Sequence, residues 1–114
     1  MEIVLANNFK NKMKINIMKK FKVVIAGDNF EVLLDGKIGK HGFFTIRFVE
    51  SKDLKEAETL VMNIIRDELE SIILNDRSDP PTMYVEENFE IDDFGDNLVP
   101  GSGFTWFKSE ETSH

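Results

Sequence analysis

The sequence contains no cysteine among its 114 residues. Disulfide bonds, thiolate nucleophiles and cysteine-based zinc sites are therefore excluded. The chain also lacks any apolar run that approaches the roughly 18 residues of a membrane-spanning helix. The apolar run near the amino terminus, within "MEIVLANNFKNK", is too short for the core of a signal peptide. We therefore expect a cytoplasmic protein that makes no membrane contact.

Basic residues are scarce in the carboxy-terminal part of the chain. Residues 75–114 hold two basic side chains and ten acidic ones, and the whole chain has a net charge of −7. Nucleic-acid binding requires positive charge along the phosphates, so we expect no nucleic-acid partner. The negative charge suits a basic protein partner instead, although it does not require one.

The residues that are present predict one globular domain with short flanking segments. Apolar residues make up 41% of the chain and aromatic residues 11%, including ten phenylalanines. A chain of this length buries about two-thirds of its unfolded surface, which is enough for one core. The segment "MKKFKVVIAG", which begins at Met18, is typical of a bacterial start. We therefore expect an extension at 1–17, frayed or continuing the first strand, an α+β domain at 18–108 and a disordered tail at 109–114.

Apolar and polar residues alternate in several short segments, which is the pattern of half-buried β-strands. Such strands are predicted at about 19–26, 30–35, 43–50, 83–92 and 104–107. The "GDN" segment at 27–29 contains residues that tolerate positive φ, so we expect it to be the turn of a hairpin between the first two strands. The glycine-containing segments at 35–42 and 92–103 are predicted loops.

One long helix is predicted at about 53–74. Its apolar residues recur at three- and four-residue steps and form a continuous stripe. Asp53 and Glu56 have the spacing of a capping box, and the acidic residues of the first turns suit the helix dipole. Asn75 is expected to end the helix in a left-handed conformation, because the prolines at 80–81 prevent continuation.

These elements predict an α+β fold in a single domain. We expect a mostly antiparallel four- or five-stranded sheet, in the order β-β-β-α-β-β, with one long helix packed on one face. The strand-to-helix junction "FVESKDLKEAE" resembles the junction in small uncharacterised bacterial α+β proteins, where a strand ends in Val-Glu and the helix opens with an acid and then Glu-Ala. The resemblance implies this fold and carries no functional residues.

Six acidic residues fall within "VEENFEIDDFGDN" at residues 85–97. An EF-hand calcium loop needs a glycine at its sixth position and a glutamate at its twelfth, and counting from Asn88 finds Asp93 and Val99 there. We therefore predict no metal site and no cofactor. The strand alternation places most of these acids on a solvated face, which is also a candidate surface for a basic protein partner. The residues of this candidate surface are Glu86, Glu90, Asp92 and Asp93.

Glu87 differs from its acidic neighbours, because it is in phase with Val85, Phe89 and Ile91 in the predicted strand. A carboxylate on an apolar face lies at the sheet margin, is paired, or is protonated. Arg47 interrupts another apolar alternation and is the candidate partner. The pair is either a marginal salt bridge or a buried polar pair that lines a ligand pocket. The candidate pocket residues are Arg47, Glu87, Tyr84, Trp106 and His41.

His41 lies in a glycine-containing segment, and the only other histidine is His114 at the end of the chain. A general base or a metal ligand needs supporting side chains, which a lone loop histidine lacks. The "PGSG" segment at 100–103 has neither the lysine nor the strand–helix context of a phosphate loop. We therefore predict no catalytic residues and lean against an enzyme; a hydrolase that uses His41 with a carboxylate is the third hypothesis.

The apolar content exceeds what one helix can cover on a small sheet. Both sides of the strand at 43–50 carry apolar residues, so either the amino-terminal segment and loops close the second face, or a second subunit does. We predict a homodimer. The leading functional hypothesis is a non-catalytic interaction module that self-associates, ahead of a small-ligand-binding domain with a pocket between sheet and loops. The other residues expected to need cover are Phe30, Leu33, Phe94, Phe104, Trp106 and Phe107.

Overall fold

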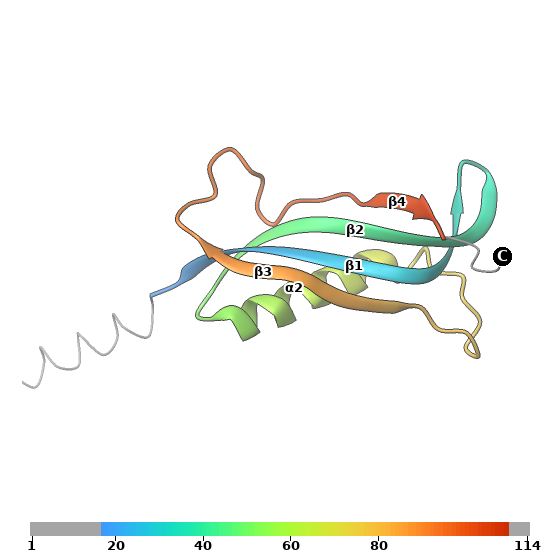
Figure 1. Ribbon diagram of the computed structural model, residues 1–114, viewed down its shortest axis with the longest axis horizontal. Coiled ribbons are helices and arrows are strands. Elements are labelled where there is room, and N and C mark those ends of the chain that lie inside the picture. Colours follow the sequence, from blue (N-terminus) through green and yellow to red (C-terminus); the bar gives the residue numbers. More distant parts are fainter. Residues whose placement is uncertain (1–16, 110–114) are drawn as a thin grey trace, which may run out of the picture.

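The computed structural model describes residues 17–109, and it confirms an α+β domain with one antiparallel sheet and one helix (Figure 1). The extension expected before Met18 therefore lies almost entirely outside the described residues, as does most of the expected tail. The elements in chain order are β1 (Lys19–Leu34), β2 (Lys37–Ser51), α2 (Leu54–Leu69), β3 (Thr82–Ile91) and β4 (Thr105–Lys108).

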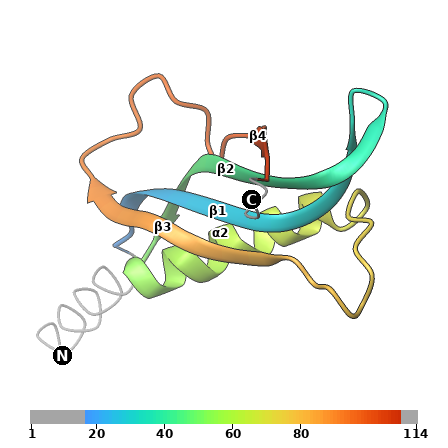
Figure 2. The same cartoon turned by 45° about the vertical axis from the view of Figure 1, so that its right-hand side comes forward.

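The four strands lie in the order β3-β1-β2-β4, and every neighbouring pair is antiparallel. Because β2 and β3 both pair with β1, they run parallel to each other on either side of it. The connection between them is α2, which crosses one face of the sheet and lies behind the strands in Figure 1; the turned view of Figure 2 shows the same two layers. The described elements leave the opposite face of the sheet without a helix.

The first strand is continuous where the sequence predicted a hairpin. Gly27–Asn29 form a bulge within β1, at which the register with β2 shifts and Asn29 has φ 62°. The hairpin turn lies at Asp35 and Gly36 instead, where φ is 53° and 79°. Residues that tolerate positive φ occur in bulges as well as in turns. The predicted position of the irregularity at 27–29 is therefore correct, but the irregularity is a bulge and not a turn.

This bulge also changes which side chains of β1 face the helix. Before it, Phe21, Val23 and Ile25 are buried, and after it Phe30 and Val32 are buried. The apolar positions thus change from odd to even numbers while they stay on the same face of the sheet. The one extra residue of the bulge therefore keeps a single strand amphipathic over its full length.

The helix begins where predicted and ends earlier. The Asp53 side chain accepts a hydrogen bond from the backbone N–H of Glu56 at 2.8 Å, and the Glu56 carboxylate accepts one from the N–H of Lys52 at 2.9 Å. The helix ends at Leu69 rather than near 74, so the predicted helix-terminating role of Asn75 is wrong. The apolar stripe continued to predict helix beyond Leu69 because Ile73 also packs against the core, although it does so from the irregular segment after the helix.

The core lies between the sheet and the helix. The buried residues of α2 are Ala57, Val61, Ile65 and Leu69, which follow one another at helical spacing. The same layer contains a cluster of four aromatic rings that meet edge to face or tilted, with centroids 5.1–6.5 Å apart. The cluster consists of Phe30, Phe43, Phe104 and Trp106. Three of the residues expected to need cover from elsewhere, Phe30, Phe104 and Trp106, are therefore packed within this domain.

Candidate interaction surface

A second bulge decides which residues of β3 face the helix. Val85 lies opposite Ile25 and Glu87 lies opposite Val24, so Glu86 is the extra residue between them. Since Ile25 is in the core, Val85 faces the helix, whereas Glu87 and the following alternate residues face the other way. The prediction that Glu87 shares a face with Val85 is therefore wrong, although it does share one with Phe89 and Ile91.

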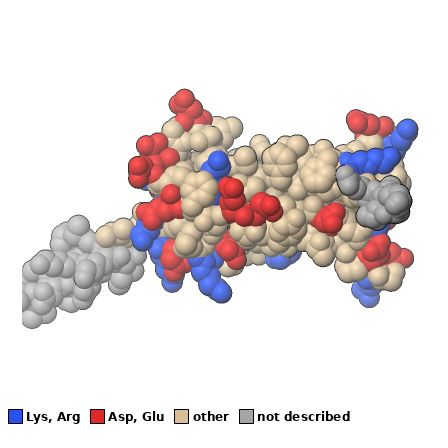
Figure 3. Space-filling view, viewed as in Figure 1, with Lys and Arg blue, Asp and Glu red and all other residues tan. Residues whose placement is uncertain are grey.

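The side of the sheet away from α2, here called the helix-free face, carries a set of exposed apolar side chains. They come from β2, β3 and β4, and each keeps between 40% and 51% of its surface accessible. Figure 3, seen from this side, shows uncharged side chains over much of the middle of the molecule, interrupted by a few acidic groups, with most charged groups toward the two ends. The apolar patch of the helix-free face consists of Phe44, Ile46, Tyr84, Phe89 and Phe107, around the half-buried Val24 and Ala26.

The loop between β3 and β4 covers only one end of this face. Phe94 packs edge-on against Phe48 with their ring centroids 6.2 Å apart, and Phe48 is 8% exposed. The backbone N–H of Phe48 donates to the carbonyl of Pro100 at 2.9 Å, which holds the loop beside β2. The expectation that loops close the second face is therefore met at this end, and Ile46 and Phe44 further along β2 stay exposed.

Few charged groups lie on the helix-free face. Lys20 and Glu50 form an ion pair at 3.8 Å at the end covered by the loop. Lys22 places its ammonium nitrogen 5.7 Å from the centre of the Phe89 ring. Within residues 17–109, neither Lys22 nor Glu87 has a partner in an ion pair or a side-chain hydrogen bond.

Arg47 lies on the opposite, helix-covered face and is completely buried. Its guanidinium donates to both carboxylate oxygens of Glu68 at 2.8 and 2.9 Å, to Thr45 Oγ1 at 2.9 Å and to the carbonyl of Gly103 at 3.1 Å. It also lies 5.2 Å from the centre of the Phe104 ring. The prediction that Glu87 is the partner of Arg47 is thus wrong, because the bulge at Glu86 places Glu87 on the other face of the sheet.

The sequence did contain a signal for Glu68, which was not recognised. It follows Ile64 and Ile65 at helical spacing and so borders the apolar stripe of α2. An acid at that position can reach across the layer to a buried base on the sheet. Arg47 therefore joins three segments, β2, α2 and the loop before β4, and its role in this structure is to hold them together.

The remaining candidate pocket residues are divided between two open clefts. His41 and Trp106 meet edge to face with ring centroids 6.4 Å apart, and they line a cleft of about 570 Å³ together with Lys108. The Nδ1 atom of His41 lies 3.0 Å from the carbonyl oxygen of Gly39, its hydrogen-bond partner within the described chain. Tyr84 lines a second cleft of about 850 Å³, which adjoins the first at Phe107 and Lys108. His41, Trp106 and Tyr84 are thus not gathered around the buried Arg47.

The acids proposed as a partner surface are all exposed but do not form one face. Glu86 is the bulge residue of β3, Glu90 lies opposite Phe21 and so on the helix side, and Asp92 and Asp93 belong to the following loop. The Asp93 carboxylate accepts the backbone N–H of Gly95 at 2.8 Å, as in a local turn. No group of three or more potential metal-ligating side chains occurs within residues 17–109.

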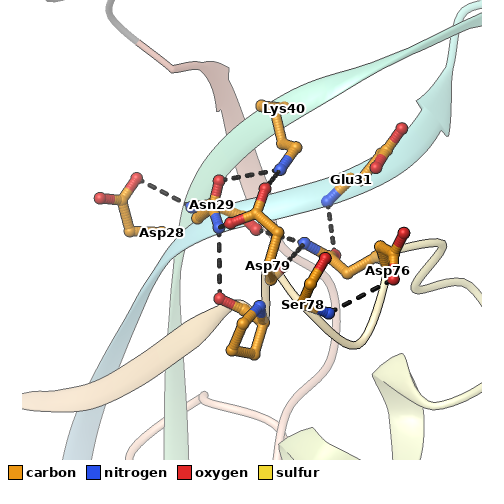
Figure 4. A network of polar contacts seen from close by, with 9 residues as sticks. Asp28, Asn29, Glu31, Lys40, Asp76, Ser78 and Asp79 are labelled. Atoms are coloured by element: carbon orange, nitrogen blue, oxygen red, sulfur yellow. Dashed lines mark hydrogen bonds and ion pairs between the residues drawn. The ribbon is translucent and has the colours of Figure 1, made fainter.

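A polar network, here called the clamp, joins the bulge of β1 to the segment before β3 and consists of Asn29, Lys40, Asn75 and Asp79 (Figure 4). The Asn75 side chain accepts from the N–H of Glu31 at 2.8 Å and donates to the carbonyls of Asn29 and Asp79 at 2.8 and 2.9 Å. Hydrogen bonds from Lys40 and then Asn29 hold the pKa of Asp79 below its ordinary value. The clamp fixes where the chain returns to the sheet after the helix.

Comparison of the chain with protein-family models, with curated proteins and with solved structures finds no match in any of the three. Among residues 17–109, no helix combines the length and the apolar character that crossing a membrane requires.

Proposed function

We propose that this protein is a non-catalytic interaction module that associates with a second copy of itself through the helix-free face. The observation that carries the proposal is the patch formed by Phe44, Ile46, Tyr84, Phe89 and Phe107 on one side of the sheet. Large apolar side chains gathered on one face and bordered by charged groups are typical of protein–protein interfaces.

The size of the patch suits a standard interface. Its five exposed side chains present about 450 Å² of apolar surface, taking about 200 Å² for each complete side chain. A standard interface uses about 800 Å² on each partner, of which about 57% is apolar. The patch with its polar border therefore supplies the area that one copy contributes to a dimer.

The alternative sites have weaker support. The cleft beside His41 and Trp106 is the candidate for a small ligand, but within residues 17–109 no carboxylate hydrogen-bonds to His41 to prepare it for catalysis. A basic protein partner is the candidate for the acidic residues, which are spread over two faces and a loop. The helix-free face is the surface on which residues from distant parts of the sequence form one continuous patch.

The proposal is tested by multi-angle light scattering at several protein concentrations, with Ile46→Lys as the test variant. The side chain of Ile46 is 40% exposed on the patch, and Leu60, also 40% exposed, lies on α2 away from it, so Leu60→Lys is a matched control. We expect the wild type and Leu60→Lys to approach twice the 13.1 kDa chain mass as concentration rises. Ile46→Lys should keep the mass of one chain.

A wild type that keeps the mass of one chain at every concentration would overturn the proposal. So would equal self-association by the wild type and Ile46→Lys. Circular dichroism of both variants verifies that each lysine leaves the fold intact, which is expected because both positions already contact solvent.

A further inference from the structure

Lys22 and Glu87 occupy particular positions within the proposed interface. Lys22 lies opposite Phe89, and Glu87 lies opposite Val24, so the two charged residues are diagonal neighbours on the helix-free face. Such neighbours are about 7–8 Å apart, and a line that passes near Phe89 and Val24 runs between them. The acid and the base thus lie on opposite sides of this line, within the area that a second copy would cover.

Covering this face changes the surroundings of both charges. In the single chain Glu87 is exposed and Lys22 is half-buried, and both lack an ion-pair partner within residues 17–109. A carboxylate that is removed from water without a partner destabilises the complex, whereas one that meets a base does not. A second copy that brings a positive charge to Glu87 and a negative charge to Lys22 avoids this cost.

Resting on the proposed function, we propose that the interface is a two-fold one in which Lys22 pairs with Glu87 of the partner subunit. In a two-fold interface every contact occurs twice, so the same arrangement brings Glu87 to Lys22 of the partner subunit. A two-fold axis that passes near Val24 places Lys22 of each subunit against Glu87 of the other. One acid and one base, neither paired within the described chain, satisfy each other completely when the partner is a second copy.

Three other charged groups near this face already have partners. Lys20 is paired with Glu50, and the Asp28 carboxylate accepts the backbone N–H of Asn29 at 2.9 Å. Lys40 is bound to Asp79 in the clamp. Lys22 interacts with the ring of Phe89, a contact that leaves its ammonium group free to turn toward a carboxylate. The pairing thus uses two neighbouring charges of opposite sign for which residues 17–109 provide no ion-pair partner.

The test is a charge exchange measured by sedimentation equilibrium on the full chain. Lys22→Glu alone places two acids together twice in each dimer, and Glu87→Lys alone places two bases together twice. We expect each single variant to weaken self-association by at least about tenfold, because like charges at an interface are strongly unfavourable. Lys55→Glu, which makes the same charge change on the exposed side of α2, is the control and should associate like the wild type.

Two combinations of these variants then test whether Lys22 pairs with Glu87 of the partner subunit. A mixture of Lys22→Glu with Glu87→Lys restores both opposite-charge contacts in the mixed dimer, and the double variant restores them in its own dimer. Recovery to within about threefold of the wild-type dissociation constant is expected for both, since every contact again joins an acid to a base, with one pair reversed in the mixed dimer and both reversed in the double variant. Circular dichroism and melting of the single variants establish that they remain folded.

The outcomes separate this inference from the proposal on which it rests. A wild type that does not self-associate overturns both. A wild type that does self-associate, with single variants that bind as tightly or with a mixture that stays as weak as its components, overturns the pairing and leaves the helix-free face as the interface. Association by pairing of the β3 edges overturns both proposals, because it does not use the helix-free face, and it is recognised by self-association that Ile46→Lys leaves unchanged.

Discussion

Replacing Glu68 with alanine removes the acid that neutralises Arg47. The guanidinium is completely buried and would keep only Thr45 Oγ1 and the Gly103 carbonyl as acceptors. Breaking a fully buried ion pair costs about 3–5 kcal/mol. The Glu68 side chain is 37% exposed, so water entering from that side offsets part of the loss. We expect the free energy of unfolding to fall by about 2–3 kcal/mol.

Urea denaturation followed by circular dichroism measures this loss. With a urea dependence of about 1.5 kcal/mol per molar, the midpoint should fall by about 1–2 M. Asp67→Ala is the matched control, because Asp67 is the exposed neighbour on the same helix and makes no ion pair in residues 17–109. Its stability should stay within about 0.5 kcal/mol of the wild type.

A Glu68→Ala midpoint equal to that of Asp67→Ala would refute the reasoning, since the buried charge would then not depend on its partner. A combined change, Arg47→Met with Glu68→Leu, tests the cause more directly. Removing both charges should be far less destabilising than removing Glu68 alone, because no unpaired charge remains buried. A double variant less stable than Glu68→Ala would instead point to the packing of Arg47 on Phe104 as the larger contribution.

Two further predictions concern the bulge of β1. The Lys40 hydrogen bond lowers the pKa of Asp79 from 3.8, so its contribution to stability is complete above that pH and is lost as pH falls through the lower native pKa. Asp79→Asn should therefore reduce the acid dependence of the urea midpoint, and an unchanged slope would argue against the Lys40 bond. Gly27→Ala places a methyl group 2.2 Å from the Phe43 ring and should lower the melting temperature by several degrees, at about 1–3 kcal/mol of overpacking. Gly39→Ala, whose added methyl meets only ordinary contact at 3.5 Å, should melt close to the wild type; equal melting of both variants would contradict the packing argument.

The sequence predicted the elements whose pattern is local. Alternation in β1 and helical spacing in α2 follow from which side chains face the core, and the capping role of Asp53 follows from a spacing of three residues. The fold class could be inferred because the predicted order β-β-β-α-β-β already has runs of strands on both sides of one helix. The count of four strands required knowing that Gly27–Asn29 form a bulge and no turn.

The features that were missed depend on contacts between distant segments. The bulge at Glu86 reverses the orientation of Glu87, and no local pattern distinguishes it from a regular strand residue. The pairing of Arg47 with Glu68 depends on where α2 crosses the sheet, and the position of Asn75 depends on the return of the chain to β1. An excess of apolar residues was visible in the sequence, but their location on one face required the strand order.

The clamp has a consequence for how relatives of this chain would diverge. Its four side chains are separated by as many as 50 positions in sequence, yet each depends on the others for its hydrogen bonds. A change at Asn75 alone would leave the backbone N–H of Glu31 and the carbonyl of Asn29 without their hydrogen-bond partner. Substitutions at Asn29, Asn75 and Asp79 are therefore expected to occur together over evolution. Surface positions such as those on α2 are free to change singly. Distant relatives should therefore be easier to recognise by this spaced group of polar residues than by overall identity.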